Sequence, residues 1–248
     1  MKPQLSIVIP CYNESENIPI VLEKFKEAIN KSQIKEIELI LVDNNSKDNT
    51  QEVLKDLLPN YPFASTVLQP IPGYGAAIYL GLKSATGNFI GWTHADLQTD
   101  PFDTIKALTI LQKQNNPEKT YLKGKRYGRP FFDKFFEFGM SIFESLILRT
   151  FLIDINAQPN IFHNSFLDKM KNPPEDFSFD LYTYYLAKSN NYHIKKFPVI
   201  FPERIHGESA WNTSFQEKIK FIKRTLDFSF KLKSLLKNAN NLSQNKYN

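Results

Sequence analysis

Cysteine is nearly missing from the chain: Cys11 is the single one among 248 residues, so no intramolecular disulfide can form. One thiol is typical of a protein in a reducing compartment, and we expect Cys11 to be a packing or loop residue rather than a nucleophile. Long apolar runs are scarce too. The run Leu5–Pro10 is too short for a signal sequence, and three charged residues interrupt the most apolar long segment, 141–155, which argues against a membrane span. We therefore expect a cytoplasmic protein.

Glycine is also scarce, with nine residues, and the pair Gly73 and Gly75 does not extend into an established phosphate-binding pattern. The Lys-Ser/Thr ending of a Walker loop and the spacing of a dinucleotide fingerprint are both missing, which argues against an ATPase. We expect a helix over 78–85, whose amino terminus would favour a phosphate or carboxylate; a plain helix start is the alternative. The net charge of +5 favours anionic partners, but no nucleic-acid-binding motif accompanies it, so we expect no nucleic-acid partner.

Short apolar runs alternate with polar loops and helix-period segments along the first half of the chain. The runs 5–10, 38–42 and 87–91 are typical of buried strands, whereas 18–29, 51–58 and 103–114 have helical spacing. This order predicts an α/β fold in which helices flank a mostly parallel central sheet. Farther along, we expect a helix over 181–189 and an outer strand over 193–201.

Polar side chains follow three of the predicted strands, and the carboxyl ends of parallel strands meet at one edge of a sheet, where ligands bind. Asp43 can accept a hydrogen bond from a base or ribose, although an Asx-turn is the common alternative. If the chain stays extended after 87–91, then His94, Asp96 and Gln98 face one side and could hold Mg²⁺ or Mn²⁺. The alternative for this stretch is a polar loop that closes on a helix capped by Asp100.

Four motifs occur in order along residues 5–125: IVIPCYNESENI, LILVDNNSKDNT, PGYGAAIYLGL and GWTHADLQTDP. Together they resemble the nucleotide-sugar-binding half of family 2 glycosyltransferases with the GT-A (Rossmann-like) fold, closest to dolichyl-phosphate or polyprenyl-phosphate sugar transferases. The resemblance implies that Asp43 holds the base or ribose of the donor. The other residues expected in the donor site are Pro10, Tyr12, Glu14, Asn45, Gly73, Gly75, His94, Ala95 and Asp96.

The family's Asp-x-Asp metal motif corresponds to residues 94–98, where His94 replaces the first aspartate. The resemblance implies that Asp96 and Gln98 keep the places next to the metal, and it leaves open whether His94 contacts metal or ribose. A neutral imidazole brings no negative charge. We therefore expect Mg²⁺ to bind more weakly than at an Asp-x-Asp site, or a preference for Mn²⁺.

Basic residues are expected to stabilise the leaving diphosphate. Segment 120–130 is predicted to be a Gly-containing basic loop in which Arg126 matches the family's Gly-x-Arg feature; a solvated turn is the alternative. Segment 202–211 resembles the Arg-x-x-Gly-x-Ser loop that closes over the donor. That resemblance assigns leaving-group stabilisation to Arg204, supported by His206 and Ser209.

The acceptor is specified less strongly. Asp176 or Asp180 could cap the helix 181–189, and Asp176 is our candidate general base if the acceptor is a hydroxyl. A lipid phosphate is already ionised and needs no base. By resemblance, Asn156 and Gln158 are candidates for sugar or acceptor contacts.

We expect a GT-A domain over 1–214, a basic amphipathic helix over 215–237 and a disordered tail over 238–248. The apolar helix predicted within 131–152 lies beside the acceptor in the family; packing on the sheet is the plainer alternative. The 215–237 helix could lie on the cytoplasmic face of an anionic membrane, or it could pack on the domain.

These features predict an inverting transferase that moves a hexose from a nucleotide diphosphate sugar to a polyprenyl (dolichyl or undecaprenyl) phosphate, as in the synthesis of cell-envelope glycans. Transfer to a sugar hydroxyl of a glycan or lipid, with Asp176 as base, is one alternative. A nucleotide-sugar-binding protein of weak activity, in which His94 has replaced an acidic ligand, is another.

Overall fold

The computed structural model describes residues 2–128, 141–200, 223 and 226–234. The chain divides into two compact units. The first unit comprises 1–129 and 156–207, and the second comprises 130–155 and 208–248. Both predicted boundaries after the main domain, at 214 and 237, lie outside the described residues and stay predictions.

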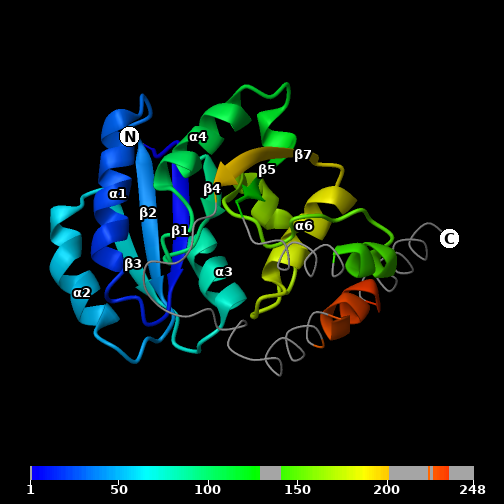
Figure 1. Cartoon of the computed structure of the whole chain (residues 1–248), viewed down its shortest axis with the longest axis horizontal. Coiled ribbons are helices and arrows are strands. Elements are labelled where there is room, and N and C mark those ends of the chain that lie inside the picture. Colours follow the sequence, from blue (N-terminus) through cyan, green and yellow to red (C-terminus); the bar gives the residue numbers. More distant parts are fainter. Residues whose placement is uncertain (1, 129–140, 201–222, 224–225, 235–248) are drawn as a thin grey trace. The chain divides into compact units, whose positions relative to one another are not determined.

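The first unit is built on a sheet of seven strands in the order β3-β2-β1-β4-β6-β5-β7 (Figure 1). The strands are β1 Leu5–Cys11, β2 Ile37–Asp43, β3 Ala64–Leu68, β4 Phe89–Trp92, β5 Thr120–Tyr127, β6 Asn160–His163 and β7 His193–Ile200. Every pair is parallel except the two made by β6, which runs antiparallel to β4 and to β5. The prediction of a mostly parallel sheet is confirmed, and β7 is the outer strand that was expected.

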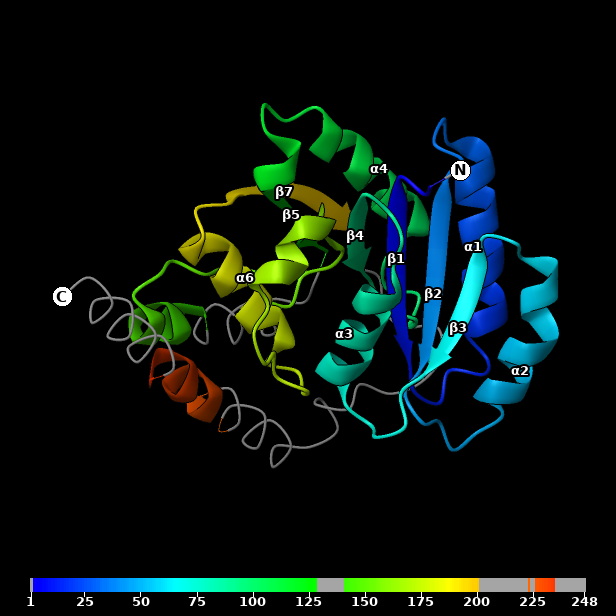
Figure 2. The same cartoon turned by 180° about the vertical axis from the view of Figure 1, so that it is seen from behind.

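Helices flank this sheet because its central strands are apolar on both faces. The helices of the first unit are α1 Ile18–Lys31, α2 Thr50–Leu57, α3 Tyr74–Ser84, α4 Pro101–Gln112 and α6 Phe179–Ser189. Alternate residues of β1 point to opposite sides, so Ile7 and Ile9 join a core cluster with residues of α1 and α4, whereas Val8 faces α3. Figures 1 and 2 show α1 and α3 on opposite sides of β1 and β2.

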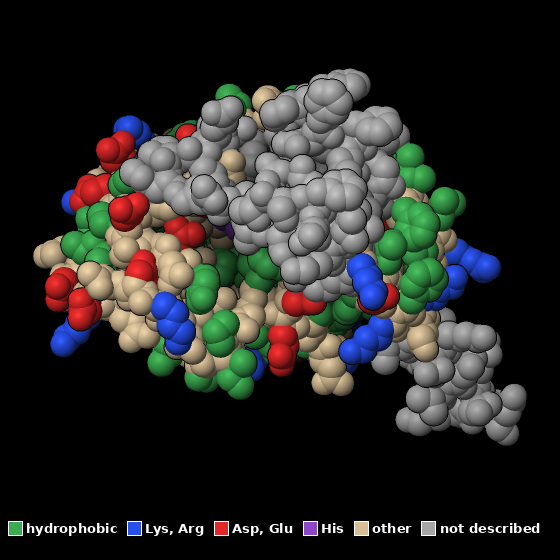
Figure 3. Space-filling model, turned by 60° about the horizontal axis from the view of Figure 1, so that its bottom comes forward, with side chains coloured by type: hydrophobic (Ala, Val, Ile, Leu, Met, Phe, Trp, Pro, Cys, Tyr) green, Lys and Arg blue, Asp and Glu red, His purple; other side chains and the backbone are tan. Residues whose placement is uncertain are grey.

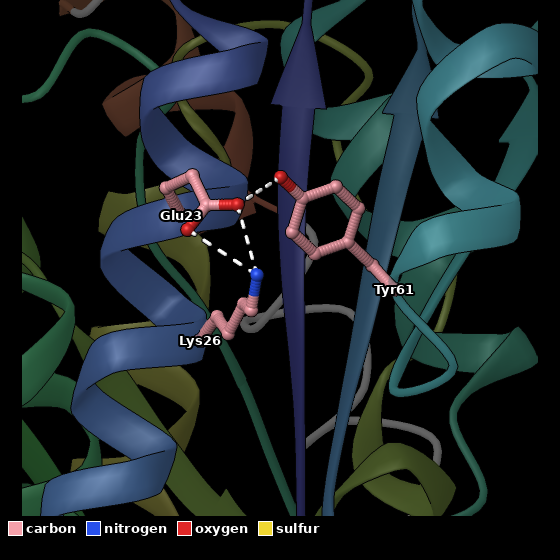
Figure 4. Close-up of polar contacts among 3 residues, drawn as sticks. All are labelled: Glu23, Lys26 and Tyr61. Atoms are coloured by element: carbon pink, nitrogen blue, oxygen red, sulfur yellow. Dashed lines mark hydrogen bonds and ion pairs between the residues drawn. The ribbon is translucent and has the colours of Figure 1, made fainter.

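A polar cluster ties α1 to the segment that precedes β3 (Figure 4). Glu23 accepts a hydrogen bond from the Tyr61 hydroxyl and forms an ion pair with Lys26, whose Nζ lies 3.1 Å from Oε1. These bonds lower the pKa of Glu23, with the Tyr61 hydroxyl as the largest cause. The cluster lies on the α1 side of the sheet and has a structural role.

Two local predictions were wrong, each for a tertiary reason, and the condition stated for residues 94–98 is not met. α3 begins at Tyr74 rather than at residue 78, because the backbone of residue 175 accepts hydrogen bonds from its first turn. Segment 120–127 is strand β5 rather than a loop, since β6 and β7 supply backbone partners on both sides. After β4 the chain does not stay extended, because Leu97 adopts a left-handed conformation with φ 60°.

The second unit contains a helical segment at 141–148 and helical residues within 226–234. The Ser145 hydroxyl accepts a hydrogen bond from the backbone of Leu152 (2.8 Å), which ties the residues after helical segment 141–148 back to it. None of the described helices is long and apolar enough to cross a membrane. On the face shown in Figure 3, acidic and basic side chains are interspersed over the described surface, so the net charge does not gather into a basic stripe there.

Candidate functional site

The loops after β1, β2 and β3 are joined at the carboxyl edge of the sheet. The backbone of Asn44 donates to Cys11 O (2.8 Å), and that of Gln69 donates to Asp43 O (2.8 Å). The Asn44 side chain in turn accepts from the backbone of Gly73 (2.8 Å). These bonds make one continuous rim from three segments that are distant in sequence.

Asparagine side chains complete this rim. Asn13 and Asn45 both adopt left-handed backbone conformations, with φ 56° and 58°, which asparagine tolerates better than most residues. Asn13 Oδ1 accepts from the backbone of Lys47 (2.8 Å), and Asn45 donates to Pro70 O (3.0 Å). Asn45 therefore lies in the predicted donor region, where its side chain braces the loops.

Asp43 ends β2 at the centre of this rim and is 3% exposed. Its Oδ1 accepts from the backbone of Ser46 (3.0 Å), three residues on, so this oxygen closes a turn of the loop, although not the two-residue Asx-turn of the alternative interpretation. Its Oδ2 has no hydrogen-bond partner among the residues that the structure describes. A buried carboxylate oxygen without a donor is costly, and a ligand N–H or O–H would remove that cost. Turn formation and ligand binding are thus compatible roles for the two oxygens.

The remaining nucleoside candidates surround Asp43 in the β1 loop. Tyr12 is 48% exposed, so its ring face is open to a ligand. Glu14 is half-buried and accepts from the Asn17 amide (2.6 Å), while its own backbone donates to Thr50 (3.0 Å). Pro10, half-buried, lies one residue before the end of β1.

The predicted metal motif forms a closed loop after β4. The Thr93 and Thr99 hydroxyls lie 2.7 Å apart across its base, and Asp96 Oδ1 accepts from the backbone of Gln98 (3.1 Å). Asp96 is 6% exposed, whereas His94 and Gln98 are half-buried. Asp100 caps α4 by accepting from the backbone two residues on (2.9 Å), as the alternative interpretation expected. This cap uses the Asp100 side chain only, so it does not compete with a role of His94, Asp96 or Gln98 in metal binding.

The donor set in this loop fits a cation held jointly with a ligand. Within the described ranges, no group of three or more His, Cys, Asp or Glu side chains could hold a metal ion without further ligands. One carboxylate together with substrate phosphates and water is how Mg²⁺ is commonly bound. Asp96 therefore suits a metal that arrives with a diphosphate.

The amino end of α3 lies against the segment that carries Asp176. The backbone N–H groups of Gly75 and Ala76 both donate to Glu175 O (2.8 and 3.1 Å). A Cβ at position 75 would lie 2.2 Å from Pro174 O, so only glycine permits this approach. These two N–H groups face protein rather than a ligand. The contacts of Gly75 explain this glycine by close packing, and the donor-site role of Gly73 and Gly75 stays a prediction.

Asp176 is half-buried, and its Oδ1 accepts from the backbone of Ser178 (2.9 Å) just before α6. Neither Asp176 nor Asp180 provides the side-chain cap of α6, because its N-cap residue is Ser178 and makes no cap hydrogen bond. The backbone of Asp176 packs against Gly75, two residues from Gly73, whose N–H bonds to Asn44 of the rim.

Asp180 is the residue whose importance the sequence did not reveal. It is 4% exposed and accepts from Gln158 Nε2 (2.8 Å) and the Tyr74 hydroxyl (3.0 Å), with Trp92 Nε1 at 3.3 Å. Burial raises the pKa of Asp180, opposed by the charge of Lys123 and these hydrogen bonds. No local pattern could have found it, because its hydrogen-bond partners lie 20 to 106 residues away.

Lys123 is fully buried in β5 and is not part of a solvated loop. Its Nζ donates to Ala157 O (3.0 Å) and Asn160 Oδ1 (3.2 Å), beside the Asp180 cluster. Arg126, three residues farther along the strand, is half-buried. Gln158 is buried and bonded to Asp180, while Asn156 is half-buried. Arg204, His206 and Ser209 lie outside the described residues.

The match to the glycosyl transferase family 2 model extends over residues 6–167, most of the chain and all strands from β1 to β6. The chain belongs to glycosyl transferase family 2. The matched residues include the rim formed by the loops after β1, β2 and β3, the loop after β4 and strand β5. The resemblance inferred from the four motifs is thus confirmed.

Curated relatives of this family 2 chain include undecaprenyl-phosphate 4-deoxy-4-formamido-L-arabinose transferases. The one from Yersinia enterocolitica is 33% identical over 112 residues, covering 44% of this chain and 34% of the relative. That from Pseudomonas fluorescens is 26% identical over 213 residues, covering 84% of this chain and 60% of the relative. The chain thus spans less than two thirds of either relative.

Solved structures confirm the GT-A fold. Glucosyl-3-phosphoglycerate synthase from Mycobacterium tuberculosis, in complex with Mn²⁺, UDP and glucosyl-3-phosphoglycerate, superposes with a TM-score of 0.69 at 13% identity, covering 93% of this chain and 80% of that one. A mannosyltransferase from Pyrobaculum calidifontis, in complex with GDP-Man and Mn²⁺, gives a TM-score of 0.60 at 19% identity, covering 84% and 59%. At such identities the likeness establishes the fold alone.

Proposed function

We propose that this chain moves a sugar, expected to be a hexose, from a nucleoside diphosphate donor to a polyprenyl phosphate with inversion at the anomeric carbon. The observation that carries the donor half is Asp43, whose buried Oδ2 lacks a partner among the described residues while Oδ1 secures the loop. A base N–H or ribose O–H is the complementary group. The acceptor half is supported by the curated relatives, which are named for transfer to undecaprenyl phosphate.

The proposed chemistry needs few protein groups. An ionised phosphate oxygen of the acceptor attacks the anomeric carbon from the face opposite the diphosphate, and the sugar–phosphate bond of the donor breaks. Arg126, which is half-buried, and Arg204 are both predicted to stabilise the departing charge. Mg²⁺ or Mn²⁺, held by Asp96 with Gln98, would neutralise the diphosphate. Both solved relatives described above contain Mn²⁺.

Contact with a membrane surface is part of the proposal, because a polyprenyl phosphate resides in a bilayer. The second unit exposes large apolar side chains on and just after its first helical segment: Ile142 (45%), Phe143 (44%), Leu146 (71%) and Phe151 (70%). Arg149 is exposed in the same stretch and could meet lipid phosphates. Apolar side chains beside a cation are typical of peripheral contact with an anionic membrane face, which we expect to be cytoplasmic.

A sugar hydroxyl remains the second candidate acceptor. Asp176 supports this acceptor, since a hydroxyl needs a base and the segment that carries Asp176 packs on the first turn of α3. An Asp176→Asn variant separates the two acceptors. Transfer to a lipid phosphate should persist, whereas transfer to a hydroxyl should fall by about 10²–10⁴-fold.

The first experiment is thermal unfolding with UDP-, GDP- and dTDP-sugars, each with and without Mn²⁺. A ligand that binds only the folded state raises its stability by mass action. We expect one nucleotide class to raise the Tm in a metal-dependent manner, and that donor then to support transfer to a short-chain polyprenyl phosphate. No rise with any nucleotide would refute the donor site. Nucleotide binding without sugar transfer would favour the alternative of a binding protein with weak activity. Restored turnover in a His94→Asp variant would support that alternative.

A further inference from the structure

A buried polar cluster lies next to the loop after β4, and the proposed chemistry does not use it directly. Its centre is the Asp180 carboxylate, which receives hydrogen bonds on both oxygens: Oδ1 from Gln158 and Trp92, and Oδ2 from the Tyr74 hydroxyl. With 4% exposure and both oxygens occupied, Asp180 is poorly suited to take a proton from an acceptor. Its role must be sought in the residues that it holds.

Tyr74 connects this carboxylate to the loop after β4. Its hydroxyl lies 3.0 Å from Asp180 Oδ2, and its ring stacks on the His94 imidazole with centroids 5.9 Å apart and an interplanar angle of 23°. The Tyr74 ring also stacks on Phe177, at 4.7 Å and 18°. His94 and Asp180 also interact electrostatically. The imidazole is therefore placed by a ring whose own orientation is set by a buried hydrogen bond.

We propose that Asp180 is a positioning residue: through the Tyr74 hydroxyl it fixes the ring on which His94 stacks, and so sets where the imidazole meets the donor diphosphate or ribose. The inference rests on the proposed function and deepens it. A carboxylate at position 94 would offer two equivalent oxygens, whereas an imidazole has two ring nitrogens in one plane and acts only when that plane is correctly turned. Stacking alone leaves the supporting ring free to tilt.

The energetic cost of the cluster fits this role better than a purely structural one. A buried carboxylate costs stability even when it is bonded, and apolar residues of similar volume often serve a core as well or better. Asp180 is nevertheless surrounded by donors from three separate segments, α3, β4 and the turn before β6. Such convergence rigidifies the elements that it joins.

The test compares Tyr74→Phe and Asp180→Asn with a matched control, Tyr121→Phe. Tyr121 is fully buried, and its hydroxyl also bonds within the cluster, to Asn160 Oδ1 (3.1 Å) and Thr183 (3.3 Å), but its ring does not stack on His94. Tyr74→Phe and Asp180→Asn should each lower kcat about tenfold or more with donor KM changed less than about threefold, the signature of a misplaced group. The double variant should be no worse than the poorer single variant, because both remove the same bond. Tyr121→Phe should keep the wild-type kcat.

A second readout does not depend on transfer. The ring-proton NMR signals of His94, assigned by their loss in His94→Gln and recorded at one pH, should shift in Tyr74→Phe and Asp180→Asn and stay in place in Tyr121→Phe. Unchanged His94 signals in Tyr74→Phe would overturn the proposal, as would an equal loss of kcat in the control. Should Asp180→Asn fail to fold, Tyr74→Phe decides alone. A wild-type protein that transfers no sugar would refute the proposed function, and the NMR comparison would still test the positioning.

Discussion

Replacing Asp43 with asparagine changes a single atom at the centre of the proposed nucleoside site. The Oδ1 atom still accepts from the backbone of Ser46 at 3.0 Å, so the turn is retained. A flipped amide would point its NH₂ group at the backbone N–H of Ser46, which is unfavourable. The buried Oδ2 becomes an NH₂ group. This group is itself a hydrogen-bond donor, so it could not accept a bond from the N–H or O–H of the bound nucleotide. A hydrogen bond to a charged group contributes about 1.5–3 kcal/mol. Donor affinity should therefore fall about 10- to 150-fold.

The stability of the free protein should respond differently. The Asp43→Asn variant would bury a neutral amide where the wild type buries a charge, so its unfolding free energy should be unchanged or higher by about 1 kcal/mol. Calorimetric titration with the nucleotide identified by thermal unfolding measures the affinity, and urea unfolding without nucleotide measures the stability. A loss of both together would mean that the substitution had damaged the loop.

Asp48→Asn is the matched control for this experiment. Asp48 lies in the same loop, but its two oxygens accept from the backbones of Thr50 (3.1 Å) and Ser15 (3.2 Å). Partial burial opposes ionisation of this carboxyl, yet its hydrogen bonds outweigh that effect and lower its pKa. Its substitution should leave nucleotide affinity within about twofold, since it removes no ligand contact. The assignment of Asp43 Oδ2 as a nucleotide contact would be refuted by wild-type nucleotide affinity in Asp43→Asn, or by an equal loss of nucleotide affinity in Asp48→Asn.

Three further predictions concern the scaffold. Gly75→Ala places a methyl group 2.2 Å from Pro174 O, and it should cost about 2–4 kcal/mol by urea unfolding, because overpacking and two weakened backbone bonds outweigh the gain in helix propensity. Glu23→Gln should make the unfolding free energy less dependent on pH in the acid range. Hydrogen bonds from Tyr61 and Lys26 lower the pKa of Glu23 in the folded protein. The stabilisation by this carboxylate is therefore present above the ordinary pKa of 4.5 and is lost as the pH falls through the folded-state pKa. Burial raises the pKa of Cys11 well above its usual value, so a thiol reagent should label the native protein at least about 10³-fold more slowly than the unfolded chain.

The first two of these predictions have matched control variants. Gly81→Ala also overpacks, with its Cβ 2.4 Å from Val8 Cγ1, but it meets a side chain at the middle of α3, so it should lower stability while leaving the backbone bonds at the first turn of α3 intact. Glu27→Gln removes a carboxylate whose ion pair with Lys31 is exposed, and it should leave the acid limb as in wild type. Rapid labelling of Cys11 in folded protein would contradict its burial.

Elements whose signals are local can be predicted from the amino-acid sequence. The apolar runs of β1 and β2 predict strands buried on both faces, and the spacing within α1 predicts a helix that begins at Ile18, as observed. The order of polar loops after these strands sufficed to indicate the donor edge, because parallel strands place their carboxyl ends together. Asp100 was also readable as a cap, since proline follows it directly.

The remaining features depend on contacts between residues that are far apart along the chain, and local patterns do not reveal such contacts. Lysines and arginines within 120–127 locally indicate a solvated loop, yet β6 and β7 pair with this segment and bury Lys123. The start of α3 depends on a carbonyl about a hundred residues away, at Glu175. Asp180 has the same explanation: neither periodicity nor spacing encodes a hydrogen bond to Tyr74, so the positioning of His94 emerges only when the strands and helices are assembled.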